Sequence, residues 1–286
     1  MKRKLIESFA KGIFLTSAIM SIIAILLICI CIFAGGLPFL KEYGLKNFLL
    51  GTEWKASDNP QSFGILPMIL GSVYVTLGAI VIGVPIGLLT AIYLAKFSSK
   101  KIYRFLKPGI NLMAGIPSIV YGFFALVVIV PFIRDVLGGT GMNIITASIL
   151  LGIMILPTVI SISEAAIRAV PNSYYEGSIA LGATHEKSIF SVVVPAARSG
   201  IVSSIILAIG RAIGETMAVI LVAGNQARMP AGLTKGVRTL TTNIVIEMAY
   251  AADKHRKALL ATAVVLFVFI LIINSTFLLL KRRSNS

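Results

Sequence analysis

The chain has 286 residues, of which 57% are hydrophobic and only 13% are charged, and its mean hydropathy is +0.95. Soluble domains are about one quarter charged, so this composition excludes an ordinary soluble enzyme and indicates a membrane protein. The formal net charge of +15 does not indicate nucleic-acid binding, because no basic face with interleaved aromatic residues appears. Basic residues that flank membrane spans meet anionic headgroups instead.

Six stretches are long and apolar enough to cross the hydrocarbon layer, which takes about 20 residues of helix. They cover residues 13–37, 67–95, 108–133, 144–163, 199–224 and 258–280. The sequence therefore predicts an all-α, polytopic membrane protein with six transmembrane helices. Its predicted parts are an N-terminal helix with an external loop (1–66), a transmembrane core (67–280) and a short tail (281–286).

The first span follows the basic residues Lys2, Arg3 and Lys4 and resembles the start of a signal peptide. Its apolar run is longer than the roughly 7 to 15 residues of a cleaved signal peptide, so we interpret it as a retained anchor. Cys29 and Cys31 lie inside this span without neighbouring metal ligands, and we expect them to be apolar filler.

The loop from 38 to 66 contains three aromatic residues, Tyr43, Trp54 and Phe63. Aromatic residues at the edge of a span usually lie at the headgroup layer, and this is the predicted role. A docking surface for an external partner is the alternative.

Glycine and proline recur inside the spans. Two Gly-x-x-x-Gly pairs, Gly83 to Gly87 and Gly210 to Gly214, predict close approach between helices. Three prolines each remove a backbone donor and favour a kink: Pro85, Pro117 and Pro157. Together these residues predict a tightly packed bundle that changes shape.

The distribution of Lys and Arg predicts the orientation. Six spans place both termini on one side of the membrane, and the segments on that side hold fifteen of the 26 Lys and Arg residues. Cytoplasmic loops carry an excess of basic residues, so both termini are predicted to be cytoplasmic. The loop from 96 to 107 contributes five positive charges and no acidic residue, and its expected role is to fix this topology.

A polar segment from 175 to 195 separates the fourth and fifth spans. It contains Glu176 followed by the small residues Gly177 and Ser178, then Gly182 and Pro195 at fixed intervals. This spacing resembles the EAA loop of ABC-transporter permeases. The resemblance implies that residues 164–198 form a cytoplasmic coupling loop through which an ATPase subunit moves the membrane helices.

Two ionisable residues, Arg211 and Glu215, lie in the middle of the fifth span. A charged Arg at this depth costs about 3 to more than 10 kcal/mol if it faces lipid, so it must face a partner or a wet cavity. The two residues are four apart, which permits an internal ion pair. Alternatively, the guanidinium group of Arg211 binds an anion such as phosphate, while Glu215 holds Arg211 in the empty state or accepts the hydrogen of a protonated phosphate.

Further motifs resemble the PstC family of phosphate-specific permeases. They are Phe63-Gly-Ile-Leu-Pro67, Ala114-Gly-Ile-Pro-Ser118, Ile153-Met-Ile-Leu-Pro157, Arg211-Ala-Ile-Gly-Glu-Thr-Met-Ala218 and Arg238-Thr-Leu-Thr241. The resemblance implies the type I ABC importer (MetI-like) fold in the inner membrane of a prokaryote, with Arg211 and Glu215 on the substrate path. The implied partners are a PstA-like permease, a PstB-like ATPase dimer and an external PstS-like phosphate-binding protein.

The sequence contains no Gly-x-x-x-x-Gly-Lys-Ser/Thr motif, so a separate subunit must hydrolyse ATP and the chain is not predicted to be an enzyme. His185 and His255 lie far apart without other ligands, and we expect no metal or other cofactor. The competing interpretations are a secondary transporter in which Arg211 and Glu215 form an ion-coupled pair, an ABC permease for another oxyanion, and a membrane-embedded sensor.

Overall fold

The computed structural model describes the backbone of residues 2–283 and the side chains of residues 7 and 9–276. The basic side chains of residues 2–4 and 281–283 lie outside the described side chains, and residues 284–286 of the predicted tail lie outside the described residues altogether. Five helical stretches are long and apolar enough to span a bilayer: Phe9–Tyr43, Leu66–Phe97, Ser118–Leu137, Ile144–Arg168 and Asp253–Thr276. A bent pair, His185–Ala196 and Arg198–Gly214, makes a sixth candidate. The predicted all-α membrane architecture is confirmed.

In chain order the helices are α1 (Lys2–Tyr43), α2 (Leu45–Leu50), α3 (Leu66–Ile92), α4 (Lys100–Gly115), α5 (Ser118–Phe124), α6 (Val130–Leu137), α7 (Ile144–Arg168), α8 (Asn172–Ala180), α9 (His185–Ser188), α10 (Val194–Ala196), α11 (Arg198–Gly214), α12 (Met217–Val222), α13 (Leu240–Met248) and α14 (Asp253–Arg283). Three π-helical turns extend them: η1 (Tyr93–Phe97), η2 (Ala125–Ile129) and η3 (Ile189–Val193). Two short antiparallel strands, β1 (Trp54–Lys55) and β2 (Ser62–Phe63), form a hairpin that pairs Trp54 with Phe63.

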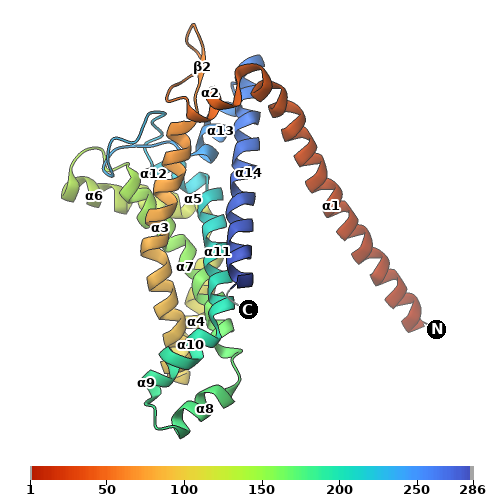
Figure 1. Ribbon diagram of the computed structural model, residues 1–286, viewed down its shortest axis with the longest axis vertical. Coiled ribbons are helices and arrows are strands. Elements are labelled where there is room, and N and C mark those ends of the chain that lie inside the picture. Colours follow the sequence, from red (N-terminus) through yellow and green to blue (C-terminus); the bar gives the residue numbers. More distant parts are fainter. Residues whose placement is uncertain (1, 284–286) are drawn as a thin grey trace.

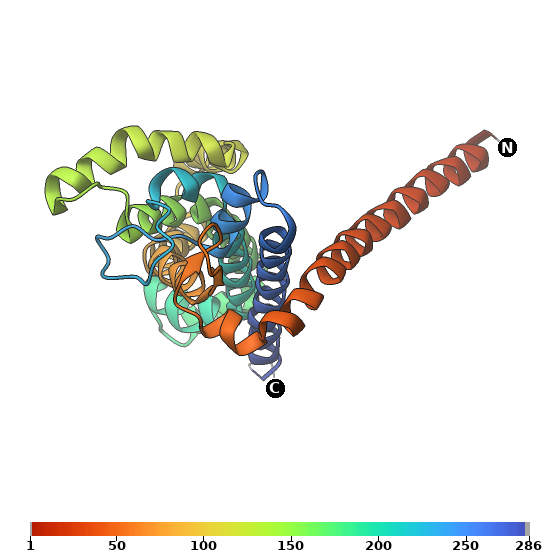
Figure 2. The same ribbon diagram turned by 90° about the horizontal axis from the view of Figure 1, so that it is seen from above.

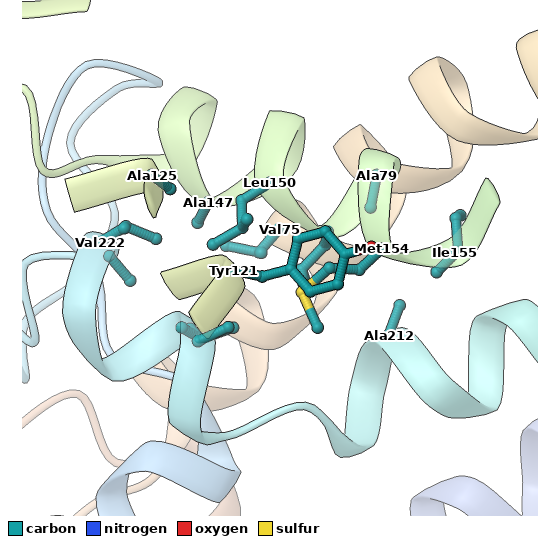
Figure 3. Packing of buried hydrophobic residues seen from close by; sticks show 14 of the residues in the cluster. Val75, Ala79, Tyr121, Ala125, Ala147, Leu150, Met154, Ile155, Ala212 and Val222 are labelled. Carbon is teal, nitrogen blue, oxygen red and sulfur yellow. The ribbon is translucent and has the colours of Figure 1, made fainter. Parts of the chain in front are cut away.

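Helices α3 and α7 form the centre of the bundle. Gly83 makes their close approach possible, because a Cβ atom there would lie 2.6 Å from the carbonyl oxygen of Gly152. Gly87 has the same role against Val159, so the first predicted glycine pair is confirmed as a helix contact. Buried apolar side chains from α3, α5, α7, α11 and α12 surround this contact and form the main core (Figure 3).

A second core lies at the end of the molecule that carries the hairpin (Figure 1). Phe39, Phe48 and Phe63 are fully buried there, Trp54 is nearly so, and Tyr43 stacks on Phe39. The prediction that Tyr43, Trp54 and Phe63 anchor the chain in the headgroup layer is therefore wrong. Their rings bury each other because the loop folds back onto α1 and α14 and offers them a drier environment than the bilayer interface.

Helix α1 touches the bundle at one end and then leans away from it (Figures 1 and 2). The contact uses Gly36, where a Cβ atom would lie 2.8 Å from the carbonyl oxygen of Leu260 in α14. The rest of the helix buries little, and its apolar side chains from Phe9 to Ile30 are exposed. An apolar helix without protein neighbours is stable in lipid or against another membrane subunit.

Two predicted spans are interrupted. The span predicted at 108–133 is wrong at its start, because residues up to Gly115 belong to the amphipathic α4 and the chain is extended at Ile116 and Pro117 before α5 begins. Pro117 explains this break, since the residue before a proline avoids helical geometry. The span predicted at 199–224 is also not continuous, because α11 ends at Gly214 and α12 begins at Met217.

The other predicted kinks and contacts differ from expectation. Helices α3 and α7 continue through Pro85 and Pro157. In the second glycine pair, Gly210 and Gly214, a Cβ atom added to either residue would meet nothing within 4 Å, so the pair forms no helix contact within the described chain. This face of α11 is left open.

Candidate functional site

The break between α11 and α12 lies within the span predicted at 199–224 and is held by hydrogen bonds. Glu215 is extended there, with φ −70° and ψ 128°. Its Oε1 atom accepts a hydrogen bond from the backbone N–H of Ala218 at 3.2 Å, which satisfies one free donor in the first turn of α12. The hydroxyl of Thr241 donates to the backbone carbonyl of Glu215 at 3.1 Å and ties the break to α13.

Arg211 lies one turn before this break, and its side chain is exposed on the subunit. It lines an open cavity of about 390 Å³ together with Thr158 of α7 and Asn274 of α14. No ion pair or hydrogen bond joins Arg211 to Glu215 in the part of the chain that the structure describes, so the predicted internal pair is not formed. The reason is the extended backbone at Glu215, which removes that residue from the face of α11 and directs its carboxylate to α12.

Helix α5 packs against α12, so the half-helices that follow the two breaks lie together. Gly122 permits this contact, because a Cβ atom there would lie 2.8 Å from the Cα of Ala218. The hydroxyl of Tyr121 donates to the backbone carbonyl of Met113 at 2.8 Å, near the end of α4. Figure 3 shows the Tyr121 ring in the same cluster as Ala212, the neighbour of Arg211.

The segment predicted as a coupling loop forms a helical hairpin at the opposite end of the molecule from the strands (Figure 1). Helix α8 buries none of its residues, and Glu176, Gly177 and Pro195 are exposed while Ser178 is half-buried. Gly182 ends the helix with a φ of +86°, a conformation that side chains other than glycine rarely adopt, and its N–H donates to the carbonyl of Ile179. The helical hairpin therefore presents an exposed helix, α8.

The base of this hairpin is fixed to the bundle. The Tyr175 hydroxyl and His185 Nδ1 are 2.9 Å apart, and the His185 ring packs edge-on to Phe97 of η1, with centroids 4.9 Å apart. The Ser188 hydroxyl donates to Ser178 Oγ at 3.0 Å and closes the hairpin. His185 therefore links Tyr175 of α8 to Phe97 of η1, which continues α3. Sequence reasoning assigned no such role to His185.

An ion-pair cluster joins the middle of α4 to the end of α7. The buried carboxylate of Glu164 accepts hydrogen bonds from Lys107 Nζ at 2.6 Å and from Arg168 Nε at 2.8 Å. The Arg168 guanidinium also donates to the carbonyl of Leu94 and stacks on Tyr103. The Glu164–Arg168 pair follows from their spacing of four residues, but the contribution of Lys107 does not.

A second network lies at the end of the molecule that carries the β1–β2 hairpin, and sequence reasoning missed it. The buried carboxylate of Glu247 accepts hydrogen bonds from Trp54 Nε1 at 2.8 Å and from Arg238, and lies 2.7 Å from His255 Nε2. Arg238 also donates to the side chain of Asn243. These residues connect the loop between α2 and α3 to α13 and α14. The only signal in the sequence was a cluster of charges between 225 and 257, which does not reveal the pairing.

Metal binding has no support in the described residues, which contain no group of three or more His, Cys, Asp or Glu side chains suited to an ion. The candidate site thus consists of the Arg211 cavity with its adjoining break and the α8 hairpin.

The sequence matches the family described as binding-protein-dependent transport system inner membrane component over residues 83–286. The chain belongs to this family. Such a component is a multi-pass inner-membrane subunit of an ABC importer, and it works with a second permease, a separate ATPase and a substrate-binding protein. The predicted class, a non-catalytic membrane subunit, is therefore confirmed.

Relatives of this family member align with nearly its whole length. The probable ABC transporter permease protein YqgH of Bacillus subtilis is 36% identical over 280 residues, which cover 95% of this chain and 91% of the relative. The phosphate transport system permease protein PstC of Mesorhizobium japonicum is 34% identical over 269 residues, which cover 86% of this chain and 81% of the relative. The resemblance to the PstC family is confirmed.

Solved structures confirm the fold of this family member. The MetNI methionine ABC transporter in an inward-facing conformation has a TM-score of 0.57 at 22% identity, over 77% of this chain and 94% of that chain. A bacterial alginate ABC transporter, in complex with a periplasmic protein that binds an alginate pentasaccharide, has a TM-score of 0.62 at 18% identity, over 96% of both chains. The predicted MetI-like fold is correct.

Proposed function

We propose that the chain is a permease subunit of an ATP-driven importer of inorganic phosphate. The observation that carries this proposal is Arg211, an exposed cation within a candidate membrane span and beside a cavity. Relatives named as phosphate transport system permease proteins support phosphate as the transported substrate. A planar guanidinium group presents several donors in a geometry that suits phosphate oxygens, and it stays charged in any surroundings.

The exposure of Arg211 also supports a shared substrate path. An ionised Arg that faces lipid costs several kcal/mol, so a second subunit must cover this face of α11. Gly210 and Gly214 leave room for a close neighbour on the same helix. We therefore assign the partner on this face as a PstA-like permease, with the path running between the two subunits.

Glu215 is proposed to accept the hydrogen of a protonated phosphate. Its Oε1 atom caps α12, while Oε2 has no hydrogen-bond partner among the described residues and is available as an acceptor. The alternative role, holding Arg211 in the empty state, has no support in the geometry, because the two side chains do not pair. One guanidinium does not neutralise divalent phosphate, so either the partner contributes a second Arg or the monobasic ion is carried.

Transport is proposed to follow alternating access driven through α8. A PstB-like ATPase dimer binds the exposed hairpin around Glu176, Gly177, Ser178 and Gly182, and Pro195 lies at the return to the bundle. Nucleotide-driven displacement of α8 reaches α3 through His185 and Phe97. A PstS-like protein delivers phosphate at the opposite end of the molecule, which carries the β1–β2 hairpin. We propose that both termini and α8 lie in the cytoplasm, and the directions of α1 and α14 in Figure 1 support this orientation.

Uptake by the reconstituted four-component complex tests this function. Proteoliposomes that hold this chain, its partner permease, the ATPase and the binding protein are expected to accumulate labelled phosphate only when ATP reaches the ATPase. Labelled sulfate serves as the substrate control and is expected not to enter. ATP-dependent uptake of sulfate in place of phosphate would assign the path to another oxyanion. Uptake of phosphate without ATP would indicate a secondary transporter.

A further inference from the structure

The proposed function leaves unused a basic cavity at the end of the molecule that carries α8. It has a volume of about 880 Å³ and lies between η1, α4 and the end of α7. Five cationic side chains line it: Lys96, Lys100, Arg104, Lys107 and Arg168. Part of its wall is apolar, formed by residues such as Leu94, Pro108 and Leu112.

The charges of the cavity are only partly neutralised. Lys107 and Arg168 bind the buried carboxylate of Glu164, which is the acidic group packed against them. Lys96, Lys100 and Arg104 have no ion-pair or hydrogen-bond partner within the described ranges of the chain. The cavity therefore holds an excess of positive charge, with donors at its wall that are free to bind an anion.

Helix α4 places this cavity at the membrane surface. Phe105 and Leu112 lie two turns apart on the helix and are 82% and 73% exposed, respectively. Basic and polar residues occupy other positions of the same helix, and an amphipathic helix of this kind lies in the headgroup layer with its apolar side chains in the acyl region. Leu112 also lines the cavity, so the cavity opens beside the acyl chains.

We propose that this cavity binds the phosphate headgroup of an anionic phospholipid. The unpaired cations receive the phosphodiester, and the apolar wall beside Leu112 receives the first part of an acyl chain. Basic pockets between membrane helices are suited to such headgroups, and each nearby Lys or Arg adds to the attraction. A free phosphate ion shares the charge but neither fills a cavity of this size nor uses its apolar wall.

Native mass spectrometry of the purified four-component complex tests this site. The probes are phosphatidylglycerol and phosphatidylcholine with the same acyl chains. The test variant is Lys96→Gln/Arg104→Gln, which leaves the packed Lys107–Glu164–Arg168 cluster intact. The matched control is Lys101→Gln/Arg198→Gln, which removes two exposed charges that do not line the cavity.

The wild-type complex is expected to retain phosphatidylglycerol in preference to phosphatidylcholine. The test variant is expected to bind phosphatidylglycerol about tenfold more weakly, while the control variant keeps the wild-type affinity. Equal weakening in both variants would contradict the site, because it would indicate diffuse attraction only. Displacement of the lipid by excess inorganic phosphate would assign the cavity to the free ion. Failure of the wild-type complex to retain the lipid, as when the ATPase covers the cavity, would also overturn the proposal.

Discussion

At the scale of single residues, burial of charge decides which side chains are structural and which are free to bind. Glu164 and Glu247 are buried, and each is surrounded by cations or donors that satisfy its carboxylate. Arg211 is exposed and has no such partner within the described part of the chain. A charge within a membrane span that the subunit does not neutralise needs a partner outside the subunit. This contrast separates the candidate path from the internal ion pairs.

Glu164→Gln tests the structural role of the cluster at the end of α7. The substitution leaves Lys107 and Arg168 without their shared anion, so we expect the free energy of unfolding to fall by about 1 to 3 kcal/mol. Thermal unfolding in detergent, followed by circular dichroism, measures this loss. Glu53→Gln is the control, because Glu53 forms an exposed ion pair with Lys55 near the β1–β2 hairpin. This substitution is expected to leave the midpoint of thermal unfolding unchanged. An unchanged midpoint for Glu164→Gln would contradict the structural role.

The sequence predicted some of these residues and missed others for a physical reason. Arg211 was recognisable because one charge within an apolar span is costly whatever its neighbours are. The Glu164–Arg168 pair follows from the helical repeat. The Glu247 network was not predictable, because Trp54 and Arg238 approach it only through tertiary folding. Contacts across the fold leave no periodic pattern in a single sequence.

At the scale of elements, the breaks in the helices are the features that position the candidate path. Pro117 gave a signal for the first break, since proline disfavours helical geometry in the residue before it. The break at Glu215 has no comparable signal and was predicted as continuous helix. It is stabilised by the Ala218 and Thr241 hydrogen bonds, of which the latter comes from a distant segment. Conversely, Pro85 and Pro157 do not interrupt their helices, because packing between α3 and α7 holds both in place.

Gly182→Leu tests the coupling role of the α8 hairpin. A leucine at φ +86° is strained by about 1 to 2 kcal/mol, so the turn after α8 is expected to change shape. We expect the assembled transporter to hydrolyse several times more ATP for each phosphate transported. Parallel measurement of phosphate uptake and ATP turnover in proteoliposomes gives this ratio.

Gly138→Leu is the matched control for this variant. Gly138 has a φ of +74° and open space around it, but it ends α6, away from the α8 hairpin. The control should keep the wild-type ratio of ATP hydrolysed to phosphate moved. An unaltered ratio in Gly182→Leu would count against the hairpin as the coupling element.

At the scale of the whole molecule, the subunit combines a tightly packed pair of central helices with several exposed helix surfaces around it. Helices α3 and α7 are joined through Gly83 and Gly87 and form the fixed centre. Most of α1, the Gly210–Gly214 face of α11 and the outer face of α8 are exposed within the described chain. Such a subunit is complete only in a bilayer and an assembly, which is consistent with its family.

Gly83→Leu tests whether the α3–α7 contact is the centre of the fold. The side chain would collide with the Gly152 carbonyl and with Ile155, whose Cγ1 lies 2.7 Å from the position of a Cβ atom. Overpacking of this kind costs about 1 to 3 kcal/mol or more, so we expect a lower melting temperature and a smaller yield of folded protein. Gly109→Leu in α4, where nothing lies within 4 Å, should retain the wild-type melting temperature. Equal melting temperatures of the two variants would contradict the central role of the α3–α7 contact.

The most direct test of the proposed path is phosphate uptake by a transporter that carries Arg211→Ala. The exposed position of Arg211 predicts that the variant assembles with all three partners, because the side chain makes no contact that holds the fold together. The account predicts that ATP-dependent uptake of labelled phosphate falls by at least about 100-fold, a loss of roughly 3 kcal/mol in binding the anion on its path. Normal assembly together with uptake at the wild-type rate would contradict it.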